Sequence, residues 1–118
     1  MFLQLNHQQL DIYKITRAFA VECYKITRGF PSEERFALSQ QIRRAVLSVH
    51  LNIAEGCSRK SLPERKRFFE VSRGSMIEID AAFDLAEDLG YCSRDTLPEF
   101  GNYMVRCFSM LSRMIRND

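Results

Sequence analysis

Four stretches of the chain carry apolar residues at intervals of three and four, which is the period of one face of a helix. The pattern predicts helices over residues 8–28, 33–55, 61–89 and 96–115. In the third stretch the predicted core face includes Phe68, Val71, Ser72, Ser75, Ile79 and Leu89. The strict alternation of apolar and polar residues that marks a half-buried strand does not occur. The sequence therefore predicts an all-α fold.

Residues that suit the first turn of a helix stand at three of the predicted starts. Ser32 precedes two glutamates and is a suitable N-cap residue. The sequences SLPE (61–64) and TLPE (96–99) each offer a hydroxyl, a proline in the first turn and a glutamate three residues after the hydroxyl, which is a capping-box pattern. We therefore expect Ser32, Ser61 and Thr96 to be N-caps.

Glycines mark the predicted helix ends. Gly29 and Gly90 each follow an apolar stretch, and Gly56 is expected to end the second helix in the left-handed conformation. The connections that remain are short, and short connections make neighbouring helices antiparallel. The sequence therefore predicts a single domain, residues 1–118, that folds as an up-down-up-down antiparallel four-helix bundle.

The second predicted helix has apolar residues on two faces. Phe36, Leu47 and Leu51 lie away from its predicted core positions, and Tyr13 and Tyr24 form a weaker second face on the first predicted helix. A second apolar face requires a second burial partner, so these five residues are interpreted as a subunit interface. The alternative is that they are single apolar groups scattered over the surface, which is ordinary in soluble proteins.

Charge is separated along the chain, although the net charge is only +2. Residues 59–73 hold six lysines and arginines against two acids, whereas residues 74–99 hold seven acids against one cation. We expect the fold to have a basic end and an acidic end, an arrangement that suits binding of a polyanion or stacking of copies.

Cations on the second predicted helix and around the start of the third are the candidate contacts to nucleic-acid phosphates: Arg43, Arg44, Arg59, Lys60, Arg65, Lys66 and Arg67. Arginine and lysine near a helix N-terminus suit phosphate contacts that do not read bases, and such binding weakens steeply with salt. Arg43 and Arg44 have an alternative role, because Glu22, Glu55 or Glu78 needs a cationic partner if it is buried.

The residue patterns of the common enzyme and metal sites are missing from the sequence. The only histidines, His7 and His50, do not form the Glu-x-x-His pairs of a di-iron bundle. No glycine-rich phosphate loop occurs, and the four cysteines contain no CxxC pair, so they are expected to be free thiols. No catalytic residue, metal ligand, cofactor or small-molecule substrate is therefore predicted.

The first residues and the apolar runs bear on localisation. Residues 1–10 lack the charged start and apolar core of a signal peptide. No apolar run approaches the length of about 20 residues that a membrane span needs. We expect a cytoplasmic protein with no membrane partner.

Three segments together resemble one protein family. "SQQIRRAVLSVHLNIAEGCSRKS" is followed by "RFFEVSRGSMIEID" and then by "LGY". The combination is similar to the bacterial four-helix bundle family known as ribosomal protein S23 or 23S rRNA intervening-sequence protein, and the likeness covers about residues 11–115. The positions that match the family pattern are Arg43, Arg44, Asn52, Glu55, Gly56, Arg59, Ser61, Gly74, Ser75 and Glu78.

The resemblance implies a small cytoplasmic bundle that forms ring-like homopentamers and has no assigned enzymatic activity. The family is also similar to the accessory variability determinant of diversity-generating retroelements, a basic pentamer that engages RNA and a reverse transcriptase. We therefore expect a homo-oligomeric scaffold, pentameric by resemblance, that binds RNA or a nucleoprotein. A protein-binding adaptor with no nucleic-acid role is the alternative.

Overall fold

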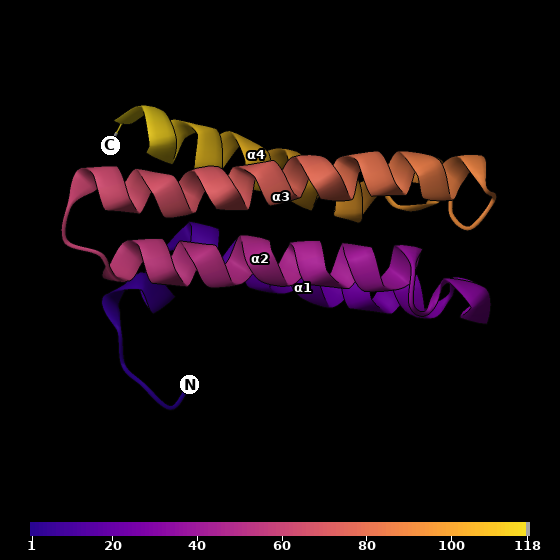
Figure 1. Ribbon diagram of the computed structural model, residues 1–118, viewed down its shortest axis with the longest axis horizontal. Coiled ribbons are helices and arrows are strands. Elements are labelled where there is room, and N and C mark those ends of the chain that lie inside the picture. The colour runs from indigo at the N-terminus through magenta and orange to yellow at the C-terminus, as the bar shows by residue number, and fades with distance from the viewer. Residues whose placement is uncertain (118) are drawn as a thin grey trace.

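The computed structural model describes residues 1–117 and consists of four long helices joined by short connections (Figure 1). The long helices are α1 (Asp11–Arg28), α2 (Leu38–Ser58), α3 (Leu62–Asp88) and α4 (Pro98–Asn117). Short 3-10 helices precede α1, α2 and α4: η1 (Asn6–Gln9), η2 (Ser32–Glu34) and η3 (Arg94–Thr96). No strand occurs among the described residues, and the all-α prediction is confirmed.

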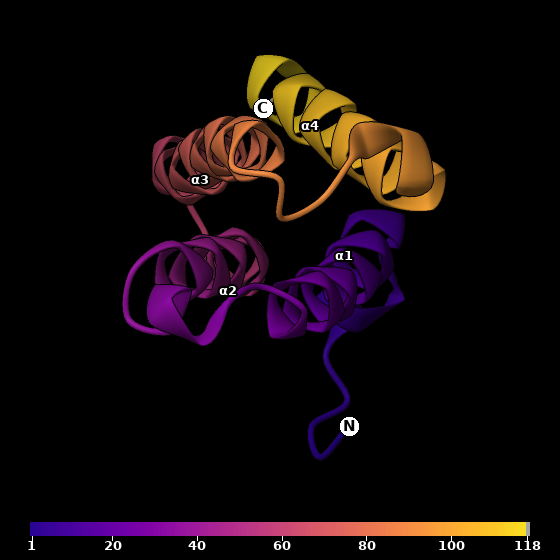
Figure 2. The ribbon, with the colours of Figure 1, turned by 90° about the vertical axis from the view of Figure 1, so that its right-hand side faces the viewer.

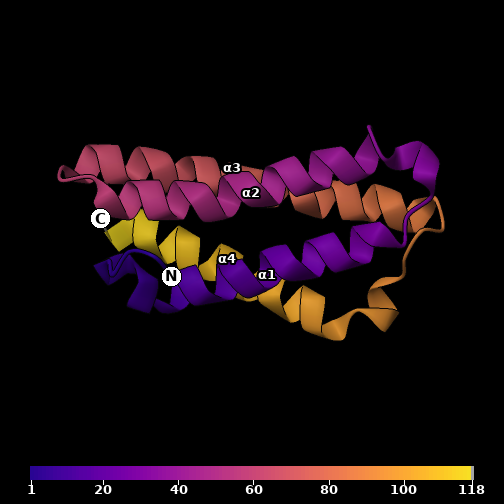
Figure 3. The ribbon, with the colours of Figure 1, turned by 90° about the horizontal axis from the view of Figure 1, so that it is seen from below.

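Consecutive helices run in opposite directions. The α1–α2 and α3–α4 connections lie at one end of the bundle, and the α2–α3 turn and the C-terminus lie at the other (Figure 1). Viewed end-on, α1 and α2 form one side of a four-sided bundle, and α3 and α4 form the opposite side (Figure 2). Seen from below, α4 crosses α1 at an angle (Figure 3). This is the predicted up-down-up-down antiparallel four-helix bundle.

All four helices contribute to one core. Large side chains with at most 1% exposure include Phe19, Ile42, Val49, Phe69, Ile79 and Leu111. The ring of Phe100 stacks on that of Phe19 at a centroid distance of 5.2 Å and contacts that of Phe83 at 4.6 Å. Full burial of one such side chain contributes roughly 1.5–3 kcal/mol, so packing of these faces holds the helices together.

α2 and α3 pack closely along a seam of small residues. The Ser72 hydroxyl donates a hydrogen bond of 2.9 Å to a backbone carbonyl of α2, and the Oγ atoms of Ser75 and Ser48 lie 2.8 Å apart. Near the α2–α3 turn, a Cβ added to Gly56 would lie 2.7 Å from Cε1 of Phe69. Glycine here permits the close approach of the ring to the backbone of α2.

The predicted start of α2 at Glu33 is wrong, and Ser32 is not its N-cap. Residues Ser32–Glu34 form η2, and α2 begins only at Leu38. The backbone N–H of Leu38 donates to the carboxylate of Glu34 at 3.3 Å. The glutamate therefore satisfies one of the donors that a helix start leaves without a helical partner.

The predicted role of Gly56 is also wrong. α2 continues to Ser58, and Gly56 is buried within its last turns. The reason for glycine at this position is the neighbouring Phe69 ring and not a left-handed backbone. Gly90 follows α3 with φ of 80°, so its predicted role in ending that helix is confirmed.

Ser61 is the N-cap of α3, as predicted. The backbone N–H of Glu64 donates to Ser61 Oγ at 3.3 Å, and the Ser61 hydroxyl donates to the Glu64 carboxylate at 3.1 Å. Thr96 does not have the equivalent role at α4, which begins at Pro98. Thr96 lies in η3 and donates its hydroxyl to the carbonyl of Ser93 at 2.8 Å.

Two residues predicted in the core face of α3 are exposed. Val71 and Leu89 face solvent, whereas Phe69 and Met76 are buried. Phe69 and Met76 each follow a predicted core position by one residue, so the buried arc of α3 is shifted from the predicted stripe, and Leu89 lies beyond the last residue of α3.

Candidate functional site

The α2–α3 turn carries a dense group of cations, and the fold itself uses Arg65. Its Nη1 donates to the backbone carbonyls of Cys57 and Arg59 at 3.2 and 3.4 Å. These carbonyls lie at the end of α2, where the last C=O groups have no helical partner. Arg65 therefore caps α2 and fixes the turn.

Arg59 faces a carboxylate of the bundle. Its Nη2 lies 2.9 Å from the carboxylate of Glu55, one helical turn earlier, and its guanidinium lies 5.0 Å from the ring centroid of Phe68. Both charged side chains are about half exposed, so the pair contributes only about 0.3–0.5 kcal/mol. A phosphate at this position would have to compete with Glu55.

Arg43 joins α2 to the end of α1. Its Nε donates to Thr27 Oγ1 at 2.9 Å, and its Nη2 donates to the backbone carbonyl of Tyr24 at 3.4 Å. The guanidinium lies 4.8 Å from the ring centroid of Tyr24, in cation–π geometry. The side chain is half-buried and has a structural role.

The carboxylates proposed as partners of Arg43 are engaged elsewhere. Glu22 pairs with Lys25 at 3.8 Å, and Glu78 accepts a hydrogen bond of 3.5 Å from a glutamine of α2. Glu55, the third carboxylate, pairs with Arg59 at the α2–α3 turn. The alternative role of Arg43 as a carboxylate partner is therefore wrong. Arg44 is exposed and likewise forms no ion pair within the described chain.

The other predicted cations differ in position. Among residues 1–117, Lys60, Lys66 and Arg67 have no carboxylate within ion-pair distance. Lys60 and Arg67 are exposed, and Lys66 is half-buried. Arg44 precedes Arg59 by 15 residues, roughly 22 Å along a helix. The structure therefore brings five of the seven predicted cations together at the α2–α3 turn and the start of α3, but leaves Arg43 and Arg44 toward the other end of α2.

Two arginines of α4 extend the basic surface, and the sequence analysis missed them. Arg113 and Arg116 lie near the end of α4, at the same end of the bundle as the α2–α3 turn (Figure 1). Arg116 lines a depression of about 520 Å³ together with Arg73, whose Nε donates to Ser112 Oγ at 2.8 Å. Only the antiparallel path of α4 brings these residues to the start of α3. We call this end, the α2–α3 turn with the last turns of α4, the basic end.

The predicted interface residues lie on the outer side of α1 and α2. Phe36, Leu47 and Leu51 are 78%, 42% and 57% exposed, whereas Tyr13 and Tyr24 are half-buried at the border of the two helices. Phe36 lies in the connection before α2 and not on the helix, because α2 starts late. The residues are thus available to a partner in different degrees.

His50 connects α1 and α2 at the same border. Its Nδ1 lies 2.8 Å from Thr16 Oγ1, and its ring packs on that of Tyr13 at 4.7 Å. Burial lowers the pKa of His50, and the nearby charges of Arg17 and His7 lower it further. The imidazole is therefore neutral near pH 7 and serves as a polar contact between the helices.

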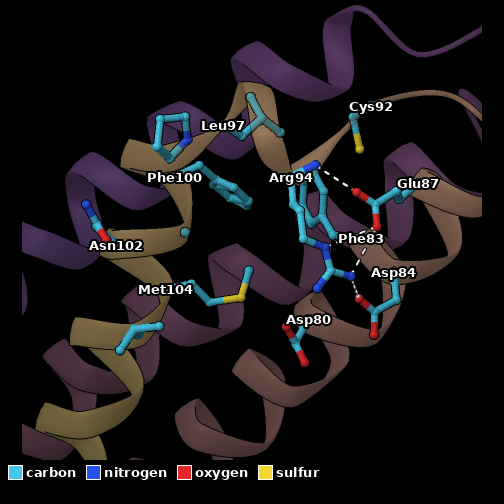
Figure 4. A pocket seen from close by; sticks show the side chains of 13 residues that line it. Asp80, Phe83, Asp84, Glu87, Cys92, Arg94, Leu97, Phe100, Asn102 and Met104 are labelled. Carbon is cyan, nitrogen blue, oxygen red and sulfur yellow. Dashed lines mark hydrogen bonds and ion pairs between the residues drawn. The ribbon is translucent and has the colours of Figure 1, made fainter.

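A groove that sequence reasoning missed follows the seam between α3 and α4 (Figure 4). It contains two adjoining depressions of about 360 and 280 Å³, which share Asp80, Met104 and Val105. Phe83 lines the larger depression and Ile77 the smaller one. Ile77 and Val105 are 52% and 67% exposed. The sequence feature that could have indicated this groove is that Ile77 and Val105 are aliphatic but lie outside the predicted core faces.

Acidic residues border this groove near the α3–α4 connection. The backbone N–H and Nε of Arg94 donate to the carboxylate of Glu87 at 2.8 and 3.1 Å, and its Nη2 donates to Asp84 at 3.2 Å (Figure 4). Hydrogen bonds from Arg94, first from its backbone, hold the pKa of Glu87 below the usual range. Asp80 also lines the groove, so three carboxylates and one guanidinium border it and its net charge is negative.

The interior thiols are not activated. Cys23 and Cys107 are buried, and burial raises the pKa of both thiols, that of Cys107 to about 12. Within the described residues, no group of three or more His, Cys, Asp or Glu side chains could hold a metal ion. In that same part of the chain, no helix has the length and apolar character needed to cross a membrane.

The fold defines a small four-helix bundle protein whose distinguishing features lie on its outer faces. The family model for the 23S rRNA-intervening sequence protein matches residues 8–113, and the chain belongs to this family. The resemblance drawn from the sequence is thereby confirmed, and the family description names no enzymatic activity.

A solved structure supports the fold independently. The chain is similar to a crystal structure of a protein with unknown function from the S23 ribosomal protein family of Bacteroides thetaiotaomicron, with a TM-score of 0.80 and 20% sequence identity. The match covers 89% of this chain and 95% of that one. No curated protein was found with detectable sequence similarity to the chain.

Proposed function

We propose that the protein is a non-enzymatic cytoplasmic scaffold of identical subunits, five by family resemblance, that binds RNA or a nucleoprotein through its basic end. The observation that carries the proposal is the separation of charge along the bundle. Cations gather at the α2–α3 turn and the end of α4, whereas Asp80, Asp84 and Glu87 lie toward the other end. A polyanion is therefore attracted to one end and repelled from the other.

The cations that suit phosphate contacts are those the fold does not use. Lys60 and Arg67 project from the α2–α3 turn and the start of α3, and Arg113 and Arg116 are exposed on the facing end of α4. Lys66 adds a half-buried stem with a charged tip. Arg59 and Arg65 shape the same turn through their contacts with Glu55 and the α2 carbonyls. Such a surface suits recognition of the RNA backbone and shape without base reading.

The exposed apolar residues on the α1–α2 side support the homo-oligomer. Leu47 and Leu51 are large aliphatic side chains in adjacent turns of α2 and are about half exposed. Their burial against another copy removes apolar surface from water. Copies placed side by side also bring several basic ends together, so that weak phosphate contacts on one copy become a multivalent site.

Binding of a labelled RNA hairpin, followed by fluorescence anisotropy across a salt series, tests the RNA role. The Lys60→Glu/Arg67→Glu variant is expected to bind at least about tenfold more weakly. The slope of log affinity against log salt should fall by about two for each engaged copy, since each phosphate contact contributes about 0.9. Both substitutions are at exposed positions outside the caps of α2 and α3.

An Arg35→Glu/Arg106→Glu variant is the matched control. It changes the net charge by the same amount, but Arg35 and Arg106 are exposed away from the basic end. It should alter affinity by less than about threefold. If the wild-type protein binds no structured RNA even at low salt, the RNA role is overturned and the protein-binding adaptor is favoured. Equal losses in the two variants would show that the net charge, and not the basic end, governs binding.

A further inference from the structure

We infer that, within the proposed homo-oligomer on which this step rests, the α1–α2 face of one copy packs into the α3–α4 groove of the next copy. The α1–α2 face comprises Arg17, Val21, Lys25, Arg28, Leu47 and Leu51. The α3–α4 groove comprises Ile77, Asp80, Asp84, Glu87, Met104 and Val105. The contact is head to tail, because the two surfaces are different.

The two surfaces lie on opposite sides of one copy. Viewed end-on, α1 and α2 form one side of the bundle, and α3 and α4 form the other (Figure 2). The α1–α2 face presents exposed Val21, Leu47 and Leu51, and the α3–α4 groove presents exposed Ile77 and Val105. A repeating contact between opposite sides leaves neither apolar surface exposed when the assembly closes into a ring.

Charge identifies a second copy as the occupant of the groove. Arg17, Lys25 and Arg28 line the depression on the α1–α2 face, which has no acidic lining residue. The α3–α4 groove is bordered by three carboxylates and a single guanidinium, which pairs with two of them, so the groove is net negative. Cationic and anionic borders around apolar centres are complementary, which fixes the register of a contact.

The charged and apolar positions also occur at matching heights. Arg28 ends α1 and Lys25 lies one turn earlier, while Glu87 is the penultimate residue of α3 and Asp84 lies one turn before it. Both helices end at the same end of the bundle (Figure 1). Four aliphatic residues lie about two to three helical turns from that end of the bundle: Val21, Leu47, Ile77 and Val105. Neighbours with parallel axes therefore set cations against carboxylates and aliphatic groups against aliphatic groups.

The available surface is large enough for a stable contact. The molecule measures 44 × 31 × 23 Å. A side of 44 by 23 Å has a projected area of about 1,000 Å², which exceeds the roughly 800 Å² per partner of a standard interface.

Two glycines open onto the same seam. Gly101 lines the α3–α4 groove, and Gly74 lines the depression that continues along the seam toward the basic end. A Cβ added at either glycine would meet nothing within 4 Å. Contacts within one copy therefore give no reason for these helical glycines, whereas a closely packed neighbour does.

Mixing two interface variants tests the head-to-tail contact by analytical ultracentrifugation. Leu47→Asp/Leu51→Asp disrupts the α1–α2 face, and Ile77→Asp/Val105→Asp disrupts the α3–α4 groove. Each variant alone should sediment as a monomer of 13.8 kDa. An equimolar mixture should give a dimer and nothing larger, because one copy supplies an intact groove and the other an intact face.

The outcomes separate this inference from the proposed oligomer. A monomeric wild-type protein would remove the oligomer itself. An oligomeric wild type whose Ile77→Asp/Val105→Asp variant keeps its mass would overturn the head-to-tail contact and leave the oligomer standing. The matched control is Val71→Asp/Leu85→Asp, which alters exposed aliphatic residues of α3 outside the groove and should leave the mass unchanged. Circular dichroism verifies that each variant is folded.

Charge reversal gives a second test that leaves the apolar residues intact. Lys25→Glu/Arg28→Glu should raise the protein concentration for half-assembly at least about tenfold. Adding Asp84→Lys and Glu87→Lys, which lie at the matching heights on α3, to the same chain should recover at least half of that loss on the logarithmic scale. No recovery in a folded, helical variant would contradict the matched heights of the two charged borders.

Discussion

The α2–α3 seam and the α3–α4 seam share one helix but are closed in different ways. Along the first, serine hydroxyls join the helices, and a glycine admits the ring of Phe69. Along the second, adjoining depressions leave Ile77 and Val105 half or more exposed. The chain itself completes one seam, and we propose that a neighbouring copy completes the other.

Removing a large side chain from each seam should produce the largest difference. Phe69→Ala is expected to lower the free energy of unfolding by about 3–5 kcal/mol, because the ring is fully buried and leaves a cavity. Val105→Ala should change it by less than about 0.5 kcal/mol, because the side chain is mostly exposed in a single copy. Urea denaturation of both variants in the Leu47→Asp/Leu51→Asp background measures the stability of one copy. Similar losses would contradict the contrast between the seams.

Adding a methyl group to a glycine of each seam should give effects of opposite sign. Gly56→Ala places a Cβ 2.7 Å from Cε1 of Phe69, and this overpacking should cost about 1–3 kcal/mol. Gly74→Ala meets open space and should stabilise a single copy by about 0.5–1 kcal/mol, because alanine favours a helix interior over glycine. Thermal unfolding in the same monomeric background measures both changes. A destabilising Gly74→Ala would show that the seam is already closed within one copy.

Features set by local sequence could be predicted, and they determine the fold. The N-cap at Ser61 depends on residues three apart, and it forms as expected. The full capping box does not form, because the Glu64 carboxylate accepts from the Ser61 hydroxyl and not from the Ser61 backbone N–H. Gly90 ends α3 through its own backbone conformation. Helical periodicity then predicts the core faces of the helices. On α3, which packs against both α2 and α4, the predicted face is slightly displaced from the buried one. The antiparallel four-helix bundle follows from these local signals and from the short connections.

The candidate site depends on contacts between distant residues, and for that reason much of it could not be predicted. Arg43 has the same charge as Lys60, but its donors are held by Thr27 and Tyr24 on another helix. In the sequence, Gly56 resembles a glycine that ends a helix. The residue that requires glycine here is Phe69, which lies on α3 and is not recognisable as a neighbour from the sequence. Sequence identified the cations as a set, and only the fold distinguishes structural arginines from those available to phosphate.

The smallest expected effect is a change in the pH dependence of stability. The titratable residue His50 joins α1 to α2, whereas serines join α2 to α3. The pKa of His50 in the folded protein lies below its ordinary value of 6.5, because burial and then the charges of Arg17 and His7 disfavour the imidazolium. The unfolded chain therefore binds the proton first as the pH falls below about 6.5. The stability contributed by neutral His50 is complete above that pH and is lost as the pH falls through the folded-state pKa.

His50→Gln should consequently reduce the loss of unfolding free energy between about pH 7.5 and pH 5, which urea denaturation at each pH measures. Glutamine can still reach Thr16 Oγ1 but does not titrate, so any loss that persists arises from other groups. Ser75→Ala is the matched control, because it removes the 2.8 Å contact with Ser48 from the α2–α3 seam. It should lower stability by about 1 kcal/mol equally at both pH values. An unchanged pH dependence in His50→Gln would show that the α1–α2 seam is no more sensitive to protons than the seam that serines join.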